Sequence, residues 1–430
     1  MSVLDVKRLV EADRVHRAVY TDPAIFDLEM ERLFGRAWLL VGHESQIPGA
    51  GDFFTTRMGR EPVVVTRHPD GGVHMLVNRC VHRGARVCEA ARGTSRVLTC
   101  PYHGWSYATD GALVSVPFPD GYQGTPAPGL ARVPRVASYR GFLFGSLAVE
   151  GPSLDEFLGP LRESFDDFVE RAPAGALEVA GGVLKHLYRG NWKLVWENLN
   201  DGVHPAFVHA SSIWAAREQP HVPGSYAEIA LRQMLQNGAS PEVWERTGIW
   251  VMPYGHSYMG DYHDDSRLVP GLNHPAFAEY RAALARRLGD EGATRVLSEL
   301  RWNSIVYPSS SFMSQFRQLR ILHPLAVDRT VIHAYTLRLK GAPEVMFRDT
   351  IAFANVVNGT GSPVLTDDLE IYERIQQALT SASTEWIHLG RGLDSDVPER
   401  AGMRRGGTGT SEIYIRNQLA AWVEYMSRES

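Results

Sequence analysis

Two short loops of this chain each place a cysteine and a histidine close together. The first reads Cys80-Val81-His82, and after 17 further residues the second reads Cys100-Pro101-Tyr102-His103. Thiolates and imidazoles are the ligands that proteins use for zinc and for iron–sulfur clusters. The spacing therefore predicts a metal centre held by four side chains, which are Cys80, His82, Cys100 and His103.

The mixed composition of each loop favours an iron–sulfur cluster over zinc. A structural zinc finger usually takes two cysteines from one loop and two histidines from the other. Here each loop supplies one of each, which suits a [2Fe–2S] cluster with one iron on Cys80 and Cys100 and the other on His82 and His103. Neutral imidazoles make such a cluster less negative and raise its reduction potential. A Cys2His2 zinc site is the alternative.

The residues around these loops fit tight turns. Gly84 and Gly104 follow closely behind the ligands and Pro101 stiffens the second loop, so backbone N–H groups are expected to approach the bridging sulfurs. Cys88 falls outside the pattern, and we interpret it as a small buried residue. Three cysteines in a chain of this size also argue against a disulfide framework.

A second group of ligands is predicted between residues 191 and 209, where Asp201, His204 and His209 lie close together. Two imidazoles and one carboxylate can occupy one face of Fe(II) and leave positions open for O₂ and substrate. Histidines five residues apart lie about 140° apart around an ideal helix, so the segment must depart from a regular helix. Because proline favours a first helical turn and its predecessor avoids helical geometry, Pro205 predicts that His204 starts a helix and that His209 lies one turn in.

The two patterns together resemble the Rieske non-haem iron oxygenases. Cys-x-His-Arg-Gly (residues 80–84) and Cys-Pro-Tyr-His-Gly-Trp (residues 100–105) look like the signature of that family, and Asn-Trp-Lys, Glu-Asn and Asp-x-x-His-x-x-x-x-His (residues 191–209) are similar to the iron-binding motif of its ring-hydroxylating members. The resemblance implies that His204 and His209 are iron ligands. It also implies that Asp201 links the two metal centres and orients His204 through a hydrogen bond. Val203 departs from the tyrosine that the family often has at this position.

The resemblance places a third iron ligand within residues 365–370, Leu-Thr-Asp-Asp-Leu-Glu. The family pattern puts the ligand at the second acid of such a pair, which is Asp368 here. Asp367 and Glu370 are the rival positions. For Asp367, a solvated helix N-terminus, where an acid suits the helix dipole, is the plainer interpretation.

Other polar residues carry less weight. Residues 254–265 contain His256, Asp261, His263, Asp264 and Asp265, which we interpret as a polar, mobile loop near the mouth of a pocket rather than a metal cluster. Arg320 and Arg416 are each able to meet a substrate carboxylate. Such arginines more often form structural ion pairs, so neither is included in the predicted site.

The composition places these sites in an ordinary globular protein. The chain has 430 residues, 44% of them hydrophobic and 22% charged, with a net charge of −5. Such a length suits two domains, and the charge leaves no basic surface for nucleic acid. No apolar run reaches the roughly 18 residues of a membrane span, and charged residues interrupt the N-terminal segment. We therefore expect a cytoplasmic protein.

Hydrophobic spacing predicts the elements that must position the sites. The first forty residues are expected to be helical, with Phe26, Met30, Leu33 and Phe34 at helical spacing. β-rich pieces follow at 62–66, 73–77 and 141–145, and a capping box at Ser153–Glu156 starts a further helix. Beyond it we expect strands at 177–188, 305–324 and 330–339, and helices at 275–288 and 411–426. The predicted domains are a helical segment packing on the catalytic domain (1–40), a Rieske [2Fe–2S] domain (41–150) and a catalytic mononuclear iron domain (151–430).

This order of elements indicates an α+β protein. The resemblance implies a small all-β Rieske [2Fe–2S] module inserted in a helix-grip (START-like) catalytic domain with an antiparallel sheet. The segment from Trp386 to Arg416 looks like the aromatic-ring dioxygenases, including enzymes for benzoate-, salicylate- and phthalate-type acids. We therefore expect a terminal oxygenase that uses a [2Fe–2S] cluster, mononuclear Fe(II) and O₂.

The expected partners are an aromatic substrate and a ferredoxin or NAD(P)H-dependent reductase. The resemblance implies a homotrimer, or an α3β3 assembly with a small beta subunit. One alternative is a Rieske monooxygenase, demethylase or quaternary-amine oxygenase acting on a non-aromatic substrate, which would share every ligand. Another is a non-catalytic electron-transfer or zinc-stabilised binding protein, which would need no second metal site.

Overall fold

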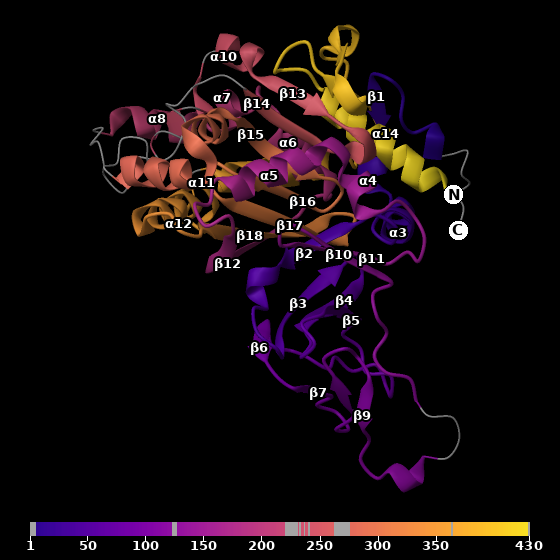
Figure 1. Ribbon diagram of the computed structural model, residues 1–430. Helices are drawn as coiled ribbons and strands as arrows, with labels where there is room; N and C mark the ends of the chain where they lie inside the picture. The colour runs from indigo at the N-terminus through magenta and orange to yellow at the C-terminus, as the bar shows by residue number, and fades with distance from the viewer. Residues whose placement is uncertain are drawn as a thin grey trace. The chain divides into compact units, whose positions relative to one another are not determined.

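The computed structural model describes residues 6–122, 127–219, 231, 234–235, 237–239, 241–261, 276–362 and 364–428. The chain divides into two compact units (Figure 1). The β-rich unit comprises Phe34–Leu154, and the larger unit comprises Met1–Leu33 together with Asp155–Ser430. The β-rich unit is thus an insertion in the sequence of the larger unit.

Three small antiparallel sheets build the β-rich unit, with strand orders β10-β11-β2, β5-β4-β3-β6 and β7-β8-β9. The predicted strands at 62–66, 73–77 and 141–145 are confirmed within one residue at each end. The bounds are β2 (Leu39–His43), β3 (Asp52–Met58), β4 (Glu61–Arg67), β5 (Val73–Val77), β6 (Arg92–Thr94), β7 (Val97–Thr99), β8 (Ser106–Ala108), β9 (Leu113–Ser115), β10 (Arg135–Tyr139) and β11 (Phe142–Ser146). A core cluster that includes Leu76, Cys80, Leu98, Cys100 and Tyr107 lies beneath the two predicted cluster loops.

A nine-stranded antiparallel sheet forms the centre of the larger unit, in the order β12-β18-β17-β16-β15-β14-β13-β21-β20. The predicted strand at 305–324 divides into three, while those at 177–188 and 330–339 are single strands. The bounds are β12 (Leu177–Tyr188), β13 (Gly248–Val251), β14 (Ser257–Asp261), β15 (Leu300–Val306), β16 (Ser310–Met313), β17 (Gln318–Ala326), β18 (Arg329–Leu339), β20 (Val397–Pro398) and β21 (Arg404–Arg405). The predicted α+β class, with an all-β module and a large antiparallel sheet, is confirmed.

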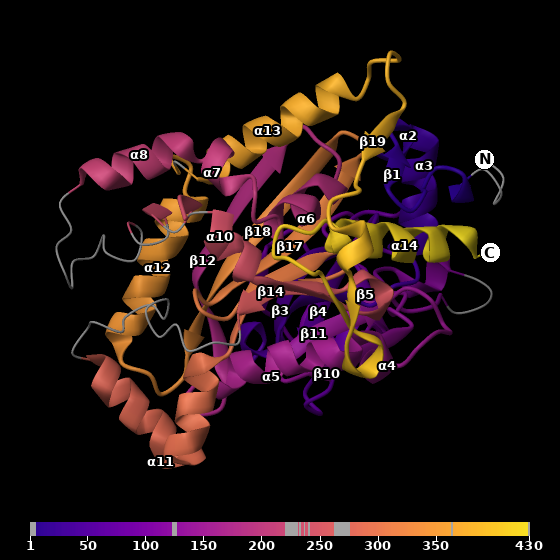
Figure 2. The same ribbon diagram turned by 90° about the horizontal axis from the view of Figure 1, so that it is seen from above.

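Helices line this sheet (Figure 2). Helix α12 (Glu344–Asn358) packs on β18, and α13 (Leu365–Ala378) contacts β12. The closing helix α14 (Ile413–Ser427) lies against β13. The predicted helix at 275–288 is part of α11 (Ala276–Ser298), which is interrupted at Gly289 where φ is +75°. The helix predicted from residue 153 is broken by a 3₁₀ turn at Gly159–Leu161 into α4 (Leu154–Leu158) and α5 (Arg162–Glu170).

The expectation that the first forty residues are helical is wrong in part. Helices α2 (Ala18–Thr21) and α3 (Pro23–Leu28) and a π-helical turn (Glu29–Leu33) are present, but Arg14–His16 form strand β1. Strand β1 pairs with β19 (Trp386–His388), far away in the sequence. Long-range pairing of this kind overrides the local helical signal. In the described part of the chain, no helix is both long and apolar enough to cross a membrane.

Candidate functional site

The two cysteine–histidine loops fold alike. The backbone N–H of Gly84 donates to the carbonyl of Cys80 at 2.9 Å, and that of Gly104 donates to the carbonyl of Cys100 at 3.0 Å. Both glycines have positive φ (78° and 72°), a conformation that side chains with a Cβ rarely adopt. The predicted tight turns are therefore present, and each turn presents its cysteine and histidine to the same region.

The four side chains form a thiol pair and an imidazole pair. Cys80 and Cys100 are each 2% exposed and lie within hydrogen-bond reach of each other, while the His82 and His103 rings are 4.6 Å apart. Four ligands of one zinc ion would bring all their donor atoms within a few ångströms of a single point. Among the described residues, no three of these side chains converge within 4.8 Å. The arrangement fits two separate irons, one per pair, better than one zinc.

Neighbouring side chains support the cluster loops. The Tyr107 hydroxyl lies 3.1 Å from Cys80 Sγ, and the His82 ring stacks on Trp105 at 5.0 Å. Burial alone would raise the pKa of the Cys80 thiol, but hydrogen bonds from Tyr107 and from the backbone bring the pKa below its ordinary value. Cys88 is half-buried, and burial raises its pKa to about 11. The sequence suggested a small buried residue, and Cys88 is buried only in part.

The second predicted site lies where a run of helix is broken twice. Helix α6 (Lys193–Leu199) ends before Asp201, the one-turn helix α7 (Pro205–Val208) follows His204, and α8 (Ala210–Glu218) begins after His209. No regular helix runs through His204, which confirms the prediction that this segment is distorted. The expectation that His204 itself would avoid helical angles is wrong, since its φ of −57° and ψ of −32° are helical. His209 lies at the junction of α7 and α8, one turn from His204.

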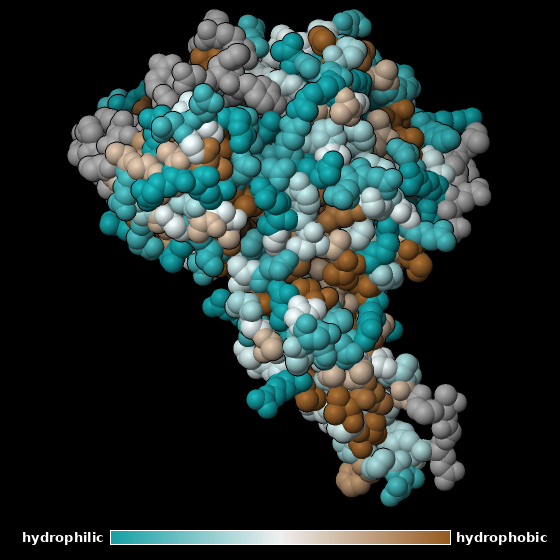
Figure 3. All heavy atoms as spheres, viewed as in Figure 1, coloured by the Kyte–Doolittle hydropathy of each residue, from teal (hydrophilic) through white to brown (hydrophobic). Residues whose placement is uncertain are grey.

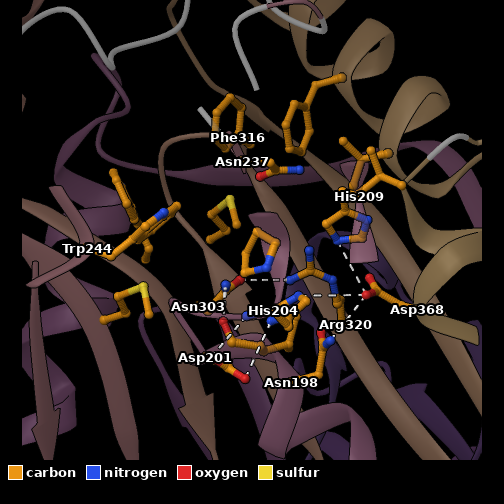
Figure 4. Close-up of a pocket in the computed structure, with 18 residues that line it drawn as sticks. Asn198, Asp201, His204, His209, Asn237, Trp244, Asn303, Phe316, Arg320 and Asp368 are labelled. Atoms are coloured by element: carbon orange, nitrogen blue, oxygen red, sulfur yellow. Dashed lines mark hydrogen bonds and ion pairs between the residues drawn. The ribbon is translucent and has the colours of Figure 1, made fainter. Parts of the chain in front are cut away.

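His204, His209 and Asp368 converge (Figure 4). Their ligating atoms all lie within 4.8 Å of one another, and this is the only such group among the described residues. Asp368 Oδ1 is 3.7 Å from His204 Nε2 and 3.4 Å from His209 Nε2. Helix α13 carries Asp368 and contacts both α6 and α7, which brings this distant carboxylate to the histidines.

The rival acids lie elsewhere. Asp367 is 3.7 Å from His209 Nδ1, on the side of the ring that faces away from Asp368. Asp201 is placed in the same way on His204, with 3.8 Å between Oδ2 and Nδ1. Glu370 is exposed and pairs with Arg374. Each histidine therefore has Asp368 near its Nε2 and a second acid near its Nδ1. That second acid is Asp201 for His204 and Asp367 for His209. The sequence pointed to Asp201 but treated Asp367 only as a rival ligand or a helix-terminal acid.

The electrostatics of this group suit a divalent cation. Burial, with the neighbouring His209, lowers the pKa of His204 to about 3, and burial lowers the pKa of His209 as well. Burial raises the pKa of Asp368 to about 7, although Asn198 Nδ2 donates to its Oδ1 at 3.1 Å. Both imidazoles are therefore neutral and free to bind a metal, and a cation would stabilise the buried carboxylate. Two neutral nitrogens and one carboxylate on one side fit Fe(II).

A cavity of about 110 Å³ opens beside this group (Figure 4). The described residues that line it include the apolar side chains of Met259, Trp302, Met313, Phe316, Phe353 and Val357. Asn237, Trp244, Asn303 and Arg320 also line it. The cavity is thus an apolar chamber with a few polar groups and a metal-ligand set at one side, which is the usual form of a small-molecule site.

The expectation of a mobile loop over residues 254–265 is wrong for its first half. Residues 257–261 form β14, and His256 is completely buried. His256 Nδ1 accepts from the Tyr307 backbone at 3.1 Å, and its Nε2 lies 2.9 Å from the carbonyl of Phe157. This histidine has a structural role. His263, Asp264 and Asp265 lie outside the described residues.

Arg320 and Arg416, which were left out of the predicted site, have different roles in the structure. Arg416 has the structural role expected of it, because it pairs with Asp396 at 3.1 Å and donates to two backbone carbonyls. Arg320 lines the cavity. Its place in the site was not predictable from the sequence, because it depends on which face of β17 turns toward the cavity.

Comparisons with known proteins agree with this geometry. Residues 37–139 match the Rieske [2Fe-2S] domain family, and residues 170–427 match the catalytic domain family of ring-hydroxylating alpha subunits. The chain is 37% identical to toluate 1,2-dioxygenase subunit alpha of Pseudomonas putida, over 86% of this chain and 82% of that protein. It is 31% identical to the large subunit of 2-halobenzoate 1,2-dioxygenase of Burkholderia cepacia, over 96% and 90% respectively.

A solved structure shows the same architecture. Naphthalene 1,2-dioxygenase with indole bound superposes with a TM-score of 0.84 at 25% identity, covering 100% of this chain and 95% of that one. The cofactors are the Rieske [2Fe–2S] cluster and a mononuclear iron, and the family uses aromatic substrates, O₂ and electron-transfer partners. The chain therefore belongs to the Rieske ring-hydroxylating oxygenases as an alpha, or catalytic, subunit, an oxidoreductase that incorporates O₂ into aromatic rings.

Proposed function

We propose that this subunit is the terminal oxygenase for a small aromatic acid of the benzoate, salicylate or phthalate type. One observation carries the proposal: His204, His209 and Asp368 converge at the side of an apolar cavity. The cavity volume of about 110 Å³ is on the scale of the ~150 Å³ cavity that holds benzene in another protein. Two of the relatives are named for toluate and 2-halobenzoate, both aromatic acids.

We assign the cluster to the paired side chains of the β-rich unit, with Cys80 and Cys100 on one iron and His82 and His103 on the other. The buried thiols and the partly exposed imidazoles support this assignment. Electrons would reach the cluster from a ferredoxin or an NAD(P)H-dependent reductase. In domain terms, we propose residues 41–150 as the Rieske domain and 151–430 as the catalytic domain. Of the N-terminal segment 1–40, the part up to Leu33 belongs to the larger unit and the part from Phe34 to the β-rich unit.

We assign the mononuclear iron to His204, His209 and Asp368. When bound, the iron supplies the site at which O₂ is held and activated beside the ring. The residues around it hold these ligands in place: Asn198 donates to Asp368, and Asp201 faces Nδ1 of His204. The apolar walls keep water from the bound ring and orient it.

We propose that the active species is a trimer of these chains, alone or as α3β3 with a small beta subunit. Two groups of exposed apolar side chains support contact between copies. Phe207 and Trp214, next to the metal-ligand segment, are 75% and 76% exposed, and Tyr102, Phe118 and Tyr122 of the β-rich unit are also exposed. Figure 3 shows apolar residues gathered on the β-rich unit in the lower part of the view. Such patches mark interfaces. In such a trimer, Asp201 of one chain would lie next to His103 of a neighbouring chain.

Oxygen uptake tests the proposed activity. We expect the purified enzyme, supplied with electrons, to consume O₂ when given benzoate-type acids and to release hydroxylated products identified by mass spectrometry. Iron analysis should give three iron atoms per chain. Zinc in place of iron, or oxygen uptake with quaternary amines and not with any aromatic compound, would refute the proposal.

A pair of variants tests the assigned ligand. Asp368→Ala should lose one iron atom of three and all oxygen uptake, while the cluster absorbance stays unchanged. Glu370→Ala is the matched control, because this exposed acid lies two residues away on the same helix. If both variants lose iron equally, or if neither does, the assignment of Asp368 is wrong.

A further inference from the structure

Arg320 is the only arginine among the described residues that line the cavity. It lies on β17, between Ser311 of β16 and Ala334 of β18 in the register of the sheet, and is 7% exposed. Figure 4 shows its guanidinium on the side of the cavity where His204 and Asp368 lie. A buried cation therefore faces the region that receives the substrate.

The partners of Arg320 are uncharged. Nη1 donates to Asn303 Oδ1 and Nη2 donates to Gln318 Oε1, each at 3.2 Å. In the part of the chain that the structure describes, no carboxylate lies within ion-pair distance of this guanidinium, and Asp368 acts on it only at longer range. Burying a charge without a counter-ion is costly, so an anion in the cavity would be strongly favoured.

Other arginines with little exposure show what is unusual here. Arg301 pairs with Asp167 and Glu163, and Arg416 pairs with Asp396. Arg317 is buried as well, but it donates to Thr350 and to the carbonyl of Met346 and does not line the cavity. Arg320 combines burial, uncharged partners and access to the cavity.

The charge of the site favours an anionic ligand further. Burial lowers the pKa of Arg320 to about 10, so the guanidinium stays charged at neutral pH. This positive charge attracts a carboxylate and repels an ammonium group. The charge of a divalent cation on His204, His209 and Asp368 would be offset by Asp368 and by Asp201 and Asp367 at the Nδ1 atoms of the histidines, so Arg320 is the group that selects for an anion. An arginine fork also matches the two oxygens of a carboxylate.

The apolar side chains that line the cavity indicate what the rest of the ligand is. Phe316 and Phe353 stack on each other at 3.8 Å, and Met313 and Val357 complete this apolar side. We propose that Arg320 is the specificity-determining residue of the pocket and binds the carboxylate of a single-ring aromatic monocarboxylate whose ring packs on these walls. This inference rests on the proposed function. It adds that the acid group enters the cavity and faces Arg320, rather than pointing to solvent.

Equilibrium binding to the iron-loaded enzyme tests the inference without turnover. Benzoate and benzamide have nearly the same shape and differ in charge, so their affinities measured by calorimetry isolate the carboxylate. We expect benzoate to bind more tightly than benzamide to the unaltered protein. Arg320→Met should weaken benzoate binding about 10- to 150-fold, the range for losing a hydrogen bond to a charged group, and change benzamide less than threefold. Arg320→Lys should give an intermediate benzoate affinity, since it keeps the charge and loses the fork.

Controls separate this role from a structural one. Iron content and cluster absorbance should match the unaltered protein in both Arg320 variants. Arg416→Met changes an arginine outside the cavity whose side chain is 10% exposed, and it should leave the ratio of benzoate to benzamide affinity unchanged. Should the unaltered enzyme bind and hydroxylate toluene or benzamide as well as benzoate, the role of Arg320 is refuted while the oxygenase function stands. Absence of oxygen uptake with every aromatic compound would instead refute the proposed function.

Discussion

The Tyr107 hydroxyl, 3.1 Å from Cys80 Sγ, is a single polar contact placed to influence the cluster. Both groups are buried, so little water competes for this hydrogen bond. A hydrogen bond to a ligand sulfur stabilises the reduced, more negative form of a cluster, and the potential rises. Tyr107 is therefore expected to set part of the potential at which the subunit accepts electrons.

Tyr107→Phe should lower the reduction potential by roughly 20–60 mV, the equivalent of one ordinary hydrogen bond in a one-electron couple. A redox titration followed by electron paramagnetic resonance measures this shift. Tyr102→Phe is the matched control, since Tyr102 lies between Cys100 and His103, five residues before Tyr107, and is 59% exposed. An unchanged potential in Tyr107→Phe, or an equal shift in both variants, would contradict the expectation.

Single residues were predictable from the sequence where their partners lie nearby in the chain. Cys80, His82, Cys100 and His103 belong to two local turns whose glycines and spacing are visible in the sequence. Asp367 lies in the first turn of α13, as the sequence suggested, but only the fold shows that it also lies beside Nδ1 of His209. The place of Arg320 depends on the order and facing of three strands, for which no local signal exists.

Helix α6 shows how an element that carries none of the assigned ligands can still position the metal site. Its Lys193 ion-pairs with Glu29, and Glu29 also accepts from the indoles of Trp192 and Trp422. Further along the helix, Asn198 donates to Asp368. Between these points, Glu197 accepts from the Tyr20 hydroxyl at 2.7 Å. The helix is thereby fixed to the N-terminal segment and to the last helix.

Glu197 makes the stability of this element depend on pH. Burial raises its pKa from 4.5 to about 7, against the opposing effects of Tyr20 and Lys193. Between these values the folded state keeps the proton and the unfolded state releases it, so stability should fall as pH rises from 4.5 to 7. A pKa shift of this size corresponds to about 3 kcal/mol in the free energy of unfolding. Because solvent reaches this half-buried side chain, we expect a change of about 2 kcal/mol.

Glu197→Gln should remove this dependence, since glutamine still accepts from Tyr20 and does not titrate. Urea unfolding at several pH values between 4.5 and 7.5 gives the comparison. The two proteins should differ in how stability changes with pH rather than in stability at one pH. Parallel curves for the two proteins would show that folding does not shift the pKa of Glu197.

Elements with a strong hydrophobic period were predictable, and those made by distant pairing were not. Strands β12 and β18 appear where the sequence places them, because their own residues carry the pattern. Strand β1 exists only because Val15, fully buried, pairs with Ile387. Pro205 predicted the helix start at His204, but not the second break at His209. The helical angles of His204 also show that local proline rules yield to tertiary packing.

At the scale of the molecule, the two units have separate core clusters, and each carries one of the two proposed metal-ligand sets. The exposed aromatic side chains next to each set have the character of an interface. The proposed trimer would pair His103 of one chain with Asp201 of the next. Two inactive variants, one without His103 and the other without Asp201, can therefore together form an active site when they assemble in one trimer.

We expect His103→Ala and Asp201→Asn to be inactive separately and active when co-assembled. In a cyclic trimer that contains both kinds of chain, one site of three combines an intact cluster neighbour with an intact Asp201. Oxygen uptake by mixed trimers, isolated through two different affinity tags, should approach that fraction of the unaltered rate. No recovery would show that each chain serves its own iron site, because every chain in the mixture carries a defect.

The insertion of Phe34–Leu154 within the larger unit has a consequence for biosynthesis. All residues of the β-rich unit leave the ribosome before the catalytic sheet is made, so this unit can fold and receive its cluster on the nascent chain. In contrast, the hydrogen bond from Trp422 to Glu29 and the pairing of β1 with β19 can form only after these distant parts of the chain have been synthesised. We therefore expect the catalytic unit to close only after Trp422 has been synthesised, and to bind iron after the β-rich unit has received its cluster.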